Sequence, residues 1–155
     1  MSQQSQSWVA RYRKPVSKSA DGHLYFIVGG ALALSLESGT EFVSHMLVAF
    51  VIERGLYCSL KNSLKRRRPA AALPGFHSHI VASDEFSFPS GHTCAAFLFV
   101  TLLVSQYGFW LLPLYIWSSC VAMSRVYLGV HFPTDTVVGA ALGSSIALIT
   151  AQSLA

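Results

Sequence analysis

The stretch "DEFSFPSGHTCAAF", residues 84–97, marks the point where a polar part of the chain gives way to an apolar one. From Phe86 to the C-terminus there are 70 residues, and only Arg125 and Asp135 among them are formally charged. Hydrocarbon solvates charges poorly, so charges kept in such a segment are expected to face a bundle interior and to have a function. The Pro-Ser-Gly-His corner is therefore expected at the polar mouth of a membrane-embedded bundle.

The composition supports a membrane protein. Hydrophobic residues make up 52% of the 155 residues and charged residues 12%, whereas about a quarter of an ordinary soluble domain is charged. The apolar residues come in five blocks, at 24–36, 43–60, about 90–107, about 109–128 and about 134–154. Blocks of this length predict membrane-crossing helices, and the shortest, 24–36, is expected to extend into its flanks. The prediction is an all-α, multi-pass transmembrane bundle forming one domain over residues 1–155, with residues 1–22 as an interfacial segment lacking an apolar signal-peptide core.

The positive charge does not point to nucleic acid. The net charge of +4 comes mostly from two clusters, residues 11–18 and 61–68, and each borders an apolar run. Such clusters are typical of juxtamembrane anchors or phosphate-binding groups, and no basic surface interleaved with aromatic residues accompanies them. We therefore expect membrane lipids, and no nucleic acid, as partners.

Five helices in series bring the remaining polar segments to one membrane face. The end of the second span, the start of the third, the end of the fourth and the start of the fifth carry "KNSLKRRRP", "FPSGH", "SRVYLGVH" and "HFPTD". Lys61, Arg68 and Arg125 supply cationic donors, and guanidinium groups suit a phosphate oxyanion. The turn at Ser90 and Gly91 is expected to leave amides unpaired at a helix N-terminus, an arrangement that binds anions.

Two histidines complete the expected site. A histidine held by a carboxylate through one ring nitrogen leaves the other nitrogen as a directed nucleophile, which suits His131 with Asp135 four residues on. A second, protonated histidine, His92, could donate to a leaving alkoxide. Taken singly, Lys61 or Arg68 could be an interface anchor, and a histidine at a helix end a cap. Their joint occurrence at one face predicts phosphoryl transfer through a phosphohistidine, with no metal or other cofactor because the cations neutralise the phosphate oxygens.

The three segments resemble the signature of the type 2 phosphatidic acid phosphatase (PAP2) superfamily. Six residues separate Lys61 from Arg68-Pro69, then comes Pro89-Ser90-Gly91-His92, and five residues separate Ser124-Arg125 from His131, with Asp135 following. The resemblance implies His131 as nucleophile, Asp135 as its orienting partner and His92 as the acid. It also implies a set of phosphate-binding residues, namely Lys61, Arg68, Ser90, Gly91 and Arg125.

The resemblance favours a lipid phosphatase over two rivals. The superfamily also contains vanadium-dependent haloperoxidases, but these resemble soluble proteins with a longer gap in the first motif. A non-catalytic lipid-binding protein would not need His131, Asp135 and His92 together. Among substrates, undecaprenyl pyrophosphate is expected first, because Lys65, Arg66 and Arg67 favour a highly charged headgroup, with phosphatidic acid or phosphatidylglycerol phosphate next. The expected location is the inner membrane with the site on its extracytoplasmic face, although counting positive charges favours the cytoplasm. The oligomeric state stays open.

Overall fold

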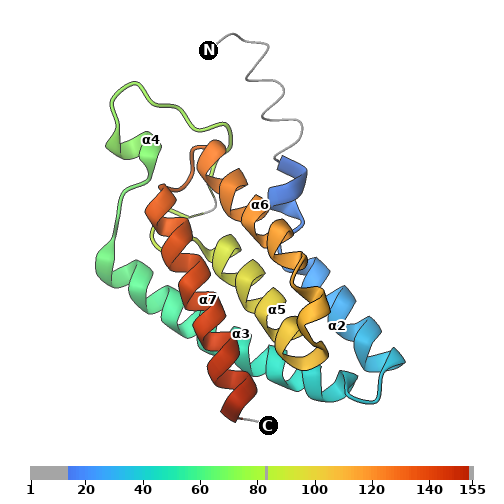
Figure 1. Ribbon diagram of the computed structural model, residues 1–155. Helices are drawn as coiled ribbons and strands as arrows, with labels where there is room; N and C mark the ends of the chain where they lie inside the picture. The colour runs from blue at the N-terminus through green and yellow to red at the C-terminus, as the bar shows by residue number, and fades with distance from the viewer. Residues whose placement is uncertain (1–13, 83, 154–155) are drawn as a thin grey trace.

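The computed structural model describes residues 14–82 and 84–153 of the chain (Figure 1). Its named elements are α2 (His23–Ser35), α3 (Gly39–Leu64), α4 (Pro69–Ala72), α5 (Gly91–Tyr107), the 3-10 helix η1 (Phe109–Leu111), α6 (Leu114–Tyr127) and α7 (Pro133–Ser153). Within these described residues the only β-type pairing is an isolated bridge between Arg67 and Phe86. The predicted all-α bundle is confirmed.

The helix bounds follow the apolar blocks, and α3 extends about four residues beyond its block at both ends. Three segments, Gly39–Leu64, Phe109–Tyr127 and Pro133–Ser153, are long and apolar enough to cross a membrane. The helix α2 was expected to extend into its flanks, and this expectation is wrong. It has 13 residues, about 20 Å of helix, because the positive φ of 99° at Gly22 precedes it and Leu36 is extended.

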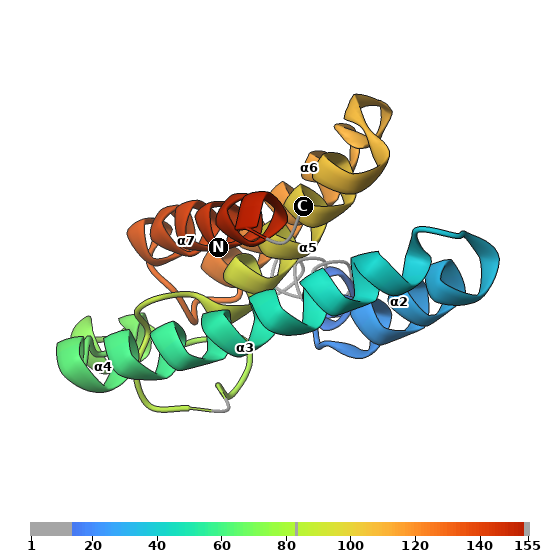
Figure 2. The same ribbon diagram turned by 90° about the horizontal axis from the view of Figure 1, so that it is seen from below.

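Helix α5 lies in the middle of the bundle and packs most closely against α7 (Figures 1 and 2). Glycines make this approach possible. A Cβ atom added at Gly139 would lie 2.7 Å from the Ser90 carbonyl oxygen, and one added at Gly143 would lie 2.1 Å from the Cys94 carbonyl oxygen. The glycine pair at positions 139 and 143 therefore allows close packing of the two helices.

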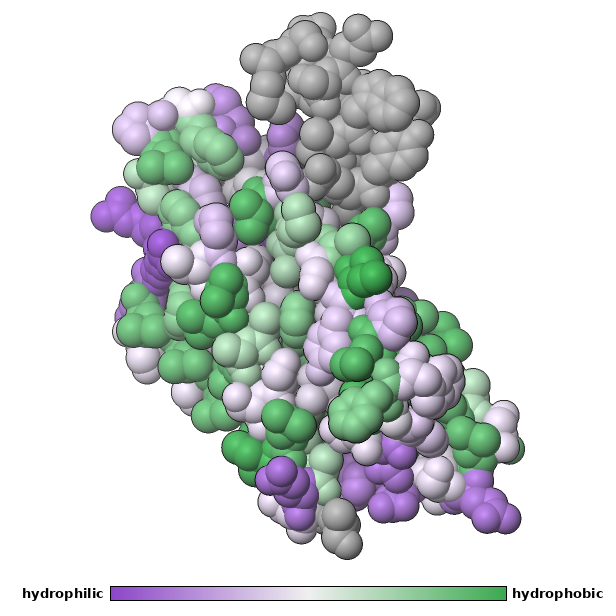
Figure 3. All heavy atoms as spheres, viewed as in Figure 1, coloured by the Kyte–Doolittle hydropathy of each residue, from purple (hydrophilic) through white to green (hydrophobic). Residues whose placement is uncertain are grey.

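The surface agrees with a membrane location. In Figure 3 hydrophilic residues gather toward the two ends of the visible face, with mostly apolar residues between them. Large side chains such as Val51, Ile116, Val137 and Ile149 are all more than 60% exposed, which suits contact with lipid. The mean hydropathy of +0.47 has the same origin.

The expected convergence of polar segments is confirmed. The end of α3, the start of α5, the end of α6 and the start of α7 lie at one end of the bundle, joined by the 65–90 connection (Figure 1). The predicted interfacial segment lies largely in residues 1–13, outside the described residues. Its described part packs against this same end, where Ser17 and Ala20 are buried.

Candidate active site

A pocket of about 660 Å³ opens at the convergent end of the bundle. Its lining includes Arg68, Gly91, His92, Arg125 and His131, so five of the eight predicted site residues face one cavity. Lys61 reaches the same place through a hydrogen bond to Asp84, which also lines the pocket.

Asp84 gathers the cations of the first motif. Its carboxylate accepts hydrogen bonds from Lys61, from Arg68 and, at 2.6 Å, from the hydroxyl of Tyr57. Arg68 also donates through Nε to the Asp84 carbonyl at 2.9 Å and through Nη1 to the Val130 carbonyl at 2.6 Å. Burial alone would raise the pKa of Asp84, but the hydrogen bonds from Lys61 and Tyr57 and the charge of Arg68 hold it well below its usual range. An anionic carboxylate thus sits where the motif cations meet.

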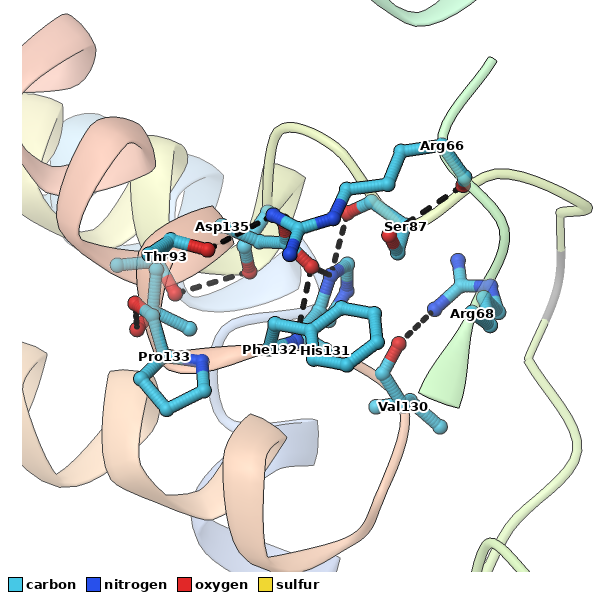
Figure 4. Close-up of polar contacts among 12 residues, drawn as sticks. Arg66, Arg68, Ser87, Thr93, Val130, His131, Phe132, Pro133 and Asp135 are labelled. Carbon is cyan, nitrogen blue, oxygen red and sulfur yellow. Dashed lines mark hydrogen bonds and ion pairs between the residues drawn. The ribbon is translucent and has the colours of Figure 1, made fainter. Parts of the chain in front are cut away.

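His131 is buried and held as a neutral base. Its Nδ1 lies 2.6 Å from the Ser87 carbonyl oxygen, and because a carbonyl can only accept, Nδ1 carries the proton and Nε2 keeps its lone pair (Figure 4). The pKa of His131 falls to about 4, mainly because burial disfavours the imidazolium. The charges of Arg68 and Arg125 lower it further, and the contacts with Asp135 and Ser87 oppose this only in part. His131 therefore stays uncharged at neutral pH.

Asp135 supports His131 differently from the simple pairing expected. Its Oδ2 is 3.8 Å from His131 Nδ1 and accepts a 2.8 Å hydrogen bond from the Phe132 amide instead. Its Oδ1 accepts a 2.7 Å bond from Arg66 Nη1, and the same nitrogen donates to Thr134 (Figure 4). Arg66 also stacks over the Phe132 ring at 4.3 Å. Arg66, expected to contact a headgroup, instead holds the buried Asp135.

His92 and Arg125 are hydrogen-bonded to residues that precede α2. His92 Nε2 lies 2.8 Å from Asp21 Oδ1, which fixes the orientation of the ring. Arg125 donates from Nη1 to the Ser17 hydroxyl at 2.6 Å, and its buried Nε has no partner among the described residues. Both Asp21 and Ser17 precede α2, and no sequence signal marks them as site residues.

The Pro-Ser-Gly turn differs from expectation. The amide of Ser90 is not free for an anion, because it donates to the Asp135 carbonyl at 3.1 Å, and the Ser90 hydroxyl is bonded to Thr93. A Cβ atom at Gly91 would lie 2.9 Å from Cε2 of Tyr57, so the missing side chain makes room for that ring. The turn therefore locks α5 to α7 and α3, and any anion contact falls to later amides of the first turn.

Together these residues form a cation-lined pocket around a neutral imidazole. Arg68 and Arg125 line it, Lys61 stands behind Asp84, and the lone pair of His131 Nε2 is available to a phosphorus atom. Within residues 14–82 and 84–153 no group of three His, Cys, Asp or Glu side chains is placed to hold a metal ion. The arrangement suits nucleophilic attack on a phosphate whose charge the cations neutralise.

Comparison with known proteins agrees with this geometry. The family model described as PAP2 superfamily matches residues 42–155. The undecaprenyl-diphosphatase of Sulfolobus acidocaldarius is 39% identical over 124 residues, covering 79% of this chain and 60% of that protein. The chain spans 60–69% of the length of the first four curated relatives it matches.

Two solved structures share the fold. LpxE of Aquifex aeolicus superimposes with a TM-score of 0.80 at 25% identity, covering 98% of this chain and 88% of that one. The transmembrane PAP2-type phosphatidylglycerolphosphate phosphatase of Bacillus subtilis gives 0.73 at 26% identity, covering 94% and 76%. The fold and site define a multi-pass membrane protein built around a pocket of about 660 Å³ lined by Arg68 and Arg125. The chain belongs to the PAP2 superfamily.

Proposed function

We propose that this chain is a membrane lipid phosphatase that works through a phosphohistidine on His131. The observation that carries the proposal is the neutral, buried His131, whose Nδ1 is bonded to Ser87 and whose Nε2 faces a pocket lined by Arg68 and Arg125. Nε2 attacks phosphorus while the bond from phosphorus to the leaving oxygen breaks. The cations take up the charge of the phosphate oxygens, which removes the need for a metal ion.

His92 is the proposed proton donor. The electron pair of the broken bond goes to the leaving oxygen, which takes a proton from His92. Water then attacks the phosphohistidine, His92 accepts a proton from that water, and the bond between phosphorus and nitrogen breaks to release inorganic phosphate. Asp135 acts on His131 through the backbone of Phe132 and through its carboxylate 3.8 Å away.

The substrate is proposed as a lipid phosphomonoester or pyrophosphate. We propose undecaprenyl pyrophosphate first, a choice supported by one relative named undecaprenyl-diphosphatase, with phosphatidic acid or phosphatidylglycerol phosphate next. One reason for undecaprenyl pyrophosphate was that Arg66 would bind a highly charged headgroup. That reason is weaker in the structure, because Arg66 is bonded to Asp135. A panel of the three lipids, ranked by kcat/KM, decides among them.

The deciding test of mechanism compares two alanine variants. His131→Ala should abolish phosphate release from lipid phosphates and aryl phosphates alike. His92→Ala should keep more activity on an activated aryl phosphate, whose leaving group needs no proton. Equal loss on both substrate types would contradict the assigned roles. No phosphate release by folded wild type would favour a non-catalytic lipid-binding protein, and halide oxidation with bound vanadate would favour a haloperoxidase-like oxidoreductase.

We further propose that the site faces the extracytoplasmic side of the inner membrane. Lys61, Arg68 and Arg125 serve phosphate binding on either side, which removes them from the count of orienting charges. A cysteine at the 97% exposed Val81, on a background lacking the three native cysteines, reports the site face. A membrane-impermeant thiol reagent should label it in intact cells, while a cysteine at Glu37, on the opposite joint, should be labelled only after permeabilisation. The reverse pattern would place the site in the cytoplasm.

A further inference from the structure

Two buried polar groups in the pocket have no use in the mechanism above. Glu53 of α3 is 0% exposed and Tyr25 of α2 is 3% exposed, and both line the same pocket as His131 and Arg125. Neither carboxylate oxygen of Glu53 nor the hydroxyl of Tyr25 has a hydrogen-bond partner among the described residues. Burying such groups without partners is costly, so they indicate a missing ligand group.

The surroundings fix these two groups in place. The Tyr25 ring packs against Phe99 at 4.9 Å and Phe50 at 5.3 Å between ring centroids, which orients its hydroxyl. Glu53 interacts with the Cys94 thiol of α5, which is only a weak hydrogen-bond donor. Its charged neighbour, Arg54, places Nη2 3.9 Å from Oε2, too far for a hydrogen bond. Figure 2 shows α3 running beside α2 on one side and α5 on the other, the three helices that enclose these groups.

The position relates this pair to the phosphate site. Glu53, Tyr57 and Lys61 follow one another at intervals of four residues on the buried face of α3. Glu53 lies one helical turn, about 6 Å, from Tyr57, whose ring packs against Gly91 beside His92. Glu53 is therefore deeper in the bundle than the phosphate site, on the side where the lipid part of a bound phosphate would extend.

We propose that Glu53 and Tyr25 form a second polar subsite, the Glu53 subsite, which binds a hydroxyl or amine carried by the substrate next to its scissile phosphate. Glu53 offers an acceptor oxygen in either protonation state, so a ligand group that donates a hydrogen bond fits it, whereas a bare hydrocarbon chain does not. This proposal rests on the proposed phosphatase function. It ranks lipid phosphates with a free hydroxyl or amine near the ester oxygen, such as phosphatidylglycerol phosphate, above polyprenyl pyrophosphates, which have none. The subsite therefore reverses the substrate order proposed above.

The test uses four synthetic substrates in detergent: decyl phosphate and its 2-hydroxy, 2-amino and 2-methoxy derivatives. The methoxy compound matches the electron withdrawal of a hydroxyl but donates no hydrogen bond. Wild type should favour the hydroxy or amino compound over the methoxy compound by about 10- to 100-fold in kcat/KM, the range for a hydrogen bond to a charged group. A ratio near one for both donors would overturn the subsite.

Variants show which residues produce the ratio. Glu53→Leu should bring the ratio of kcat/KM for the hydroxy or amino compound to that for the methoxy compound close to one, and Tyr25→Phe should lower this ratio. Glu53→Gln distinguishes the two donors, since it keeps an acceptor for a hydroxyl but removes the charge that an ammonium needs. The control is Glu41→Gln, an exposed change on the same helix that should leave the ratio unchanged. Partial misfolding would lower all four rates together and leave the ratio intact, so a ratio unchanged in Glu53→Leu and Tyr25→Phe would also overturn the subsite. No phosphate release from any of the four would overturn the phosphatase function itself.

Discussion

Asp84 occupies the cations that a substrate phosphate needs, so removing its charge should strengthen anion binding. Its carboxylate is bonded to Lys61, Arg68 and Tyr57. An arriving phosphate has to replace it at Lys61 and Arg68, and one charge-assisted hydrogen bond contributes about 1.5–3 kcal/mol, or about 10- to 100-fold in affinity. Because the Asp84 side chain is 35% exposed, solvent screening favours the lower end of that range. Asp84→Asn should therefore bind vanadate or inorganic phosphate about 10-fold more tightly.

The assay is competitive inhibition of phosphate release by vanadate. Glu85→Gln is the matched control, because Glu85 is the next residue and is exposed. The difference between Asp84→Asn and wild type should persist at pH 5, since the lowered pKa keeps Asp84 ionised there. An inhibition constant that rises in Asp84→Asn would refute the argument and assign Asp84 to holding Lys61 and Arg68 in place.

Three further predictions follow from the site and its packing. Gly143→Ala should lower the Tm in detergent by clashing with the α5 backbone, a cost of about 1–3 kcal/mol, while Gly30→Ala, with open space around it, should not. Because the pKa of His131 is lowered to about 4 in the folded protein, the neutral ring favours the folded state fully above about pH 6.5, and this contribution is lost as the pH falls toward 4. The Tm of wild type should therefore fall over this pH range, and the Tm of His131→Ala should lack this part of the decrease. Arg66→Gln should lower both kcat and Tm by leaving the buried Asp135 carboxylate without its cation, whereas the exposed Arg67→Gln should change neither.

Much of the fold could be predicted from the chain because local rules govern it. The bounds of α5 and α7 follow from Pro89-Ser90-Gly91 and from Pro133, since proline and glycine mark helix boundaries. Because consecutive membrane helices alternate in direction, the number of helices between the motif segments predicts that these segments meet at one end of the bundle. The sequence locates α2 at its apolar block, but it does not show that the helix ends there, because that depends on the backbone at Gly22 and Leu36.

The pairing within the site could be predicted only in part. Motif spacing brings Asp135 within 3.8 Å of His131, but the expected direct hydrogen bond is replaced by bonds from His131 to Ser87 and from Phe132 to Asp135. The partners supplied by Asp84, Asp21 and Arg66 lie in polar connections without periodicity, whose path depends on tertiary packing. A basic run such as residues 65–67 predicts exposed surface charge, and nothing in its composition shows that Arg66 contacts the buried Asp135. Glu53 stands inside the apolar block 43–60, but its lack of a hydrogen-bond partner depends on the packing of α2 and α5 around it.

The contact of α5 and α7 through Gly139 and Gly143 separates two kinds of evolutionary freedom in this molecule. His92 and His131 are carried at adjoining ends of a helix pair whose spacing tolerates no added methyl group at these glycines. The pocket wall away from the histidines comes largely from α2 and α3. Its residues Tyr25, Phe26, Phe50 and Glu53 take no part in the close contact of α5 with α7. Substrate preference can therefore change at these positions of α2 and α3, while the histidines at the starts of α5 and α7 and Lys61 at the end of α3 stay in place.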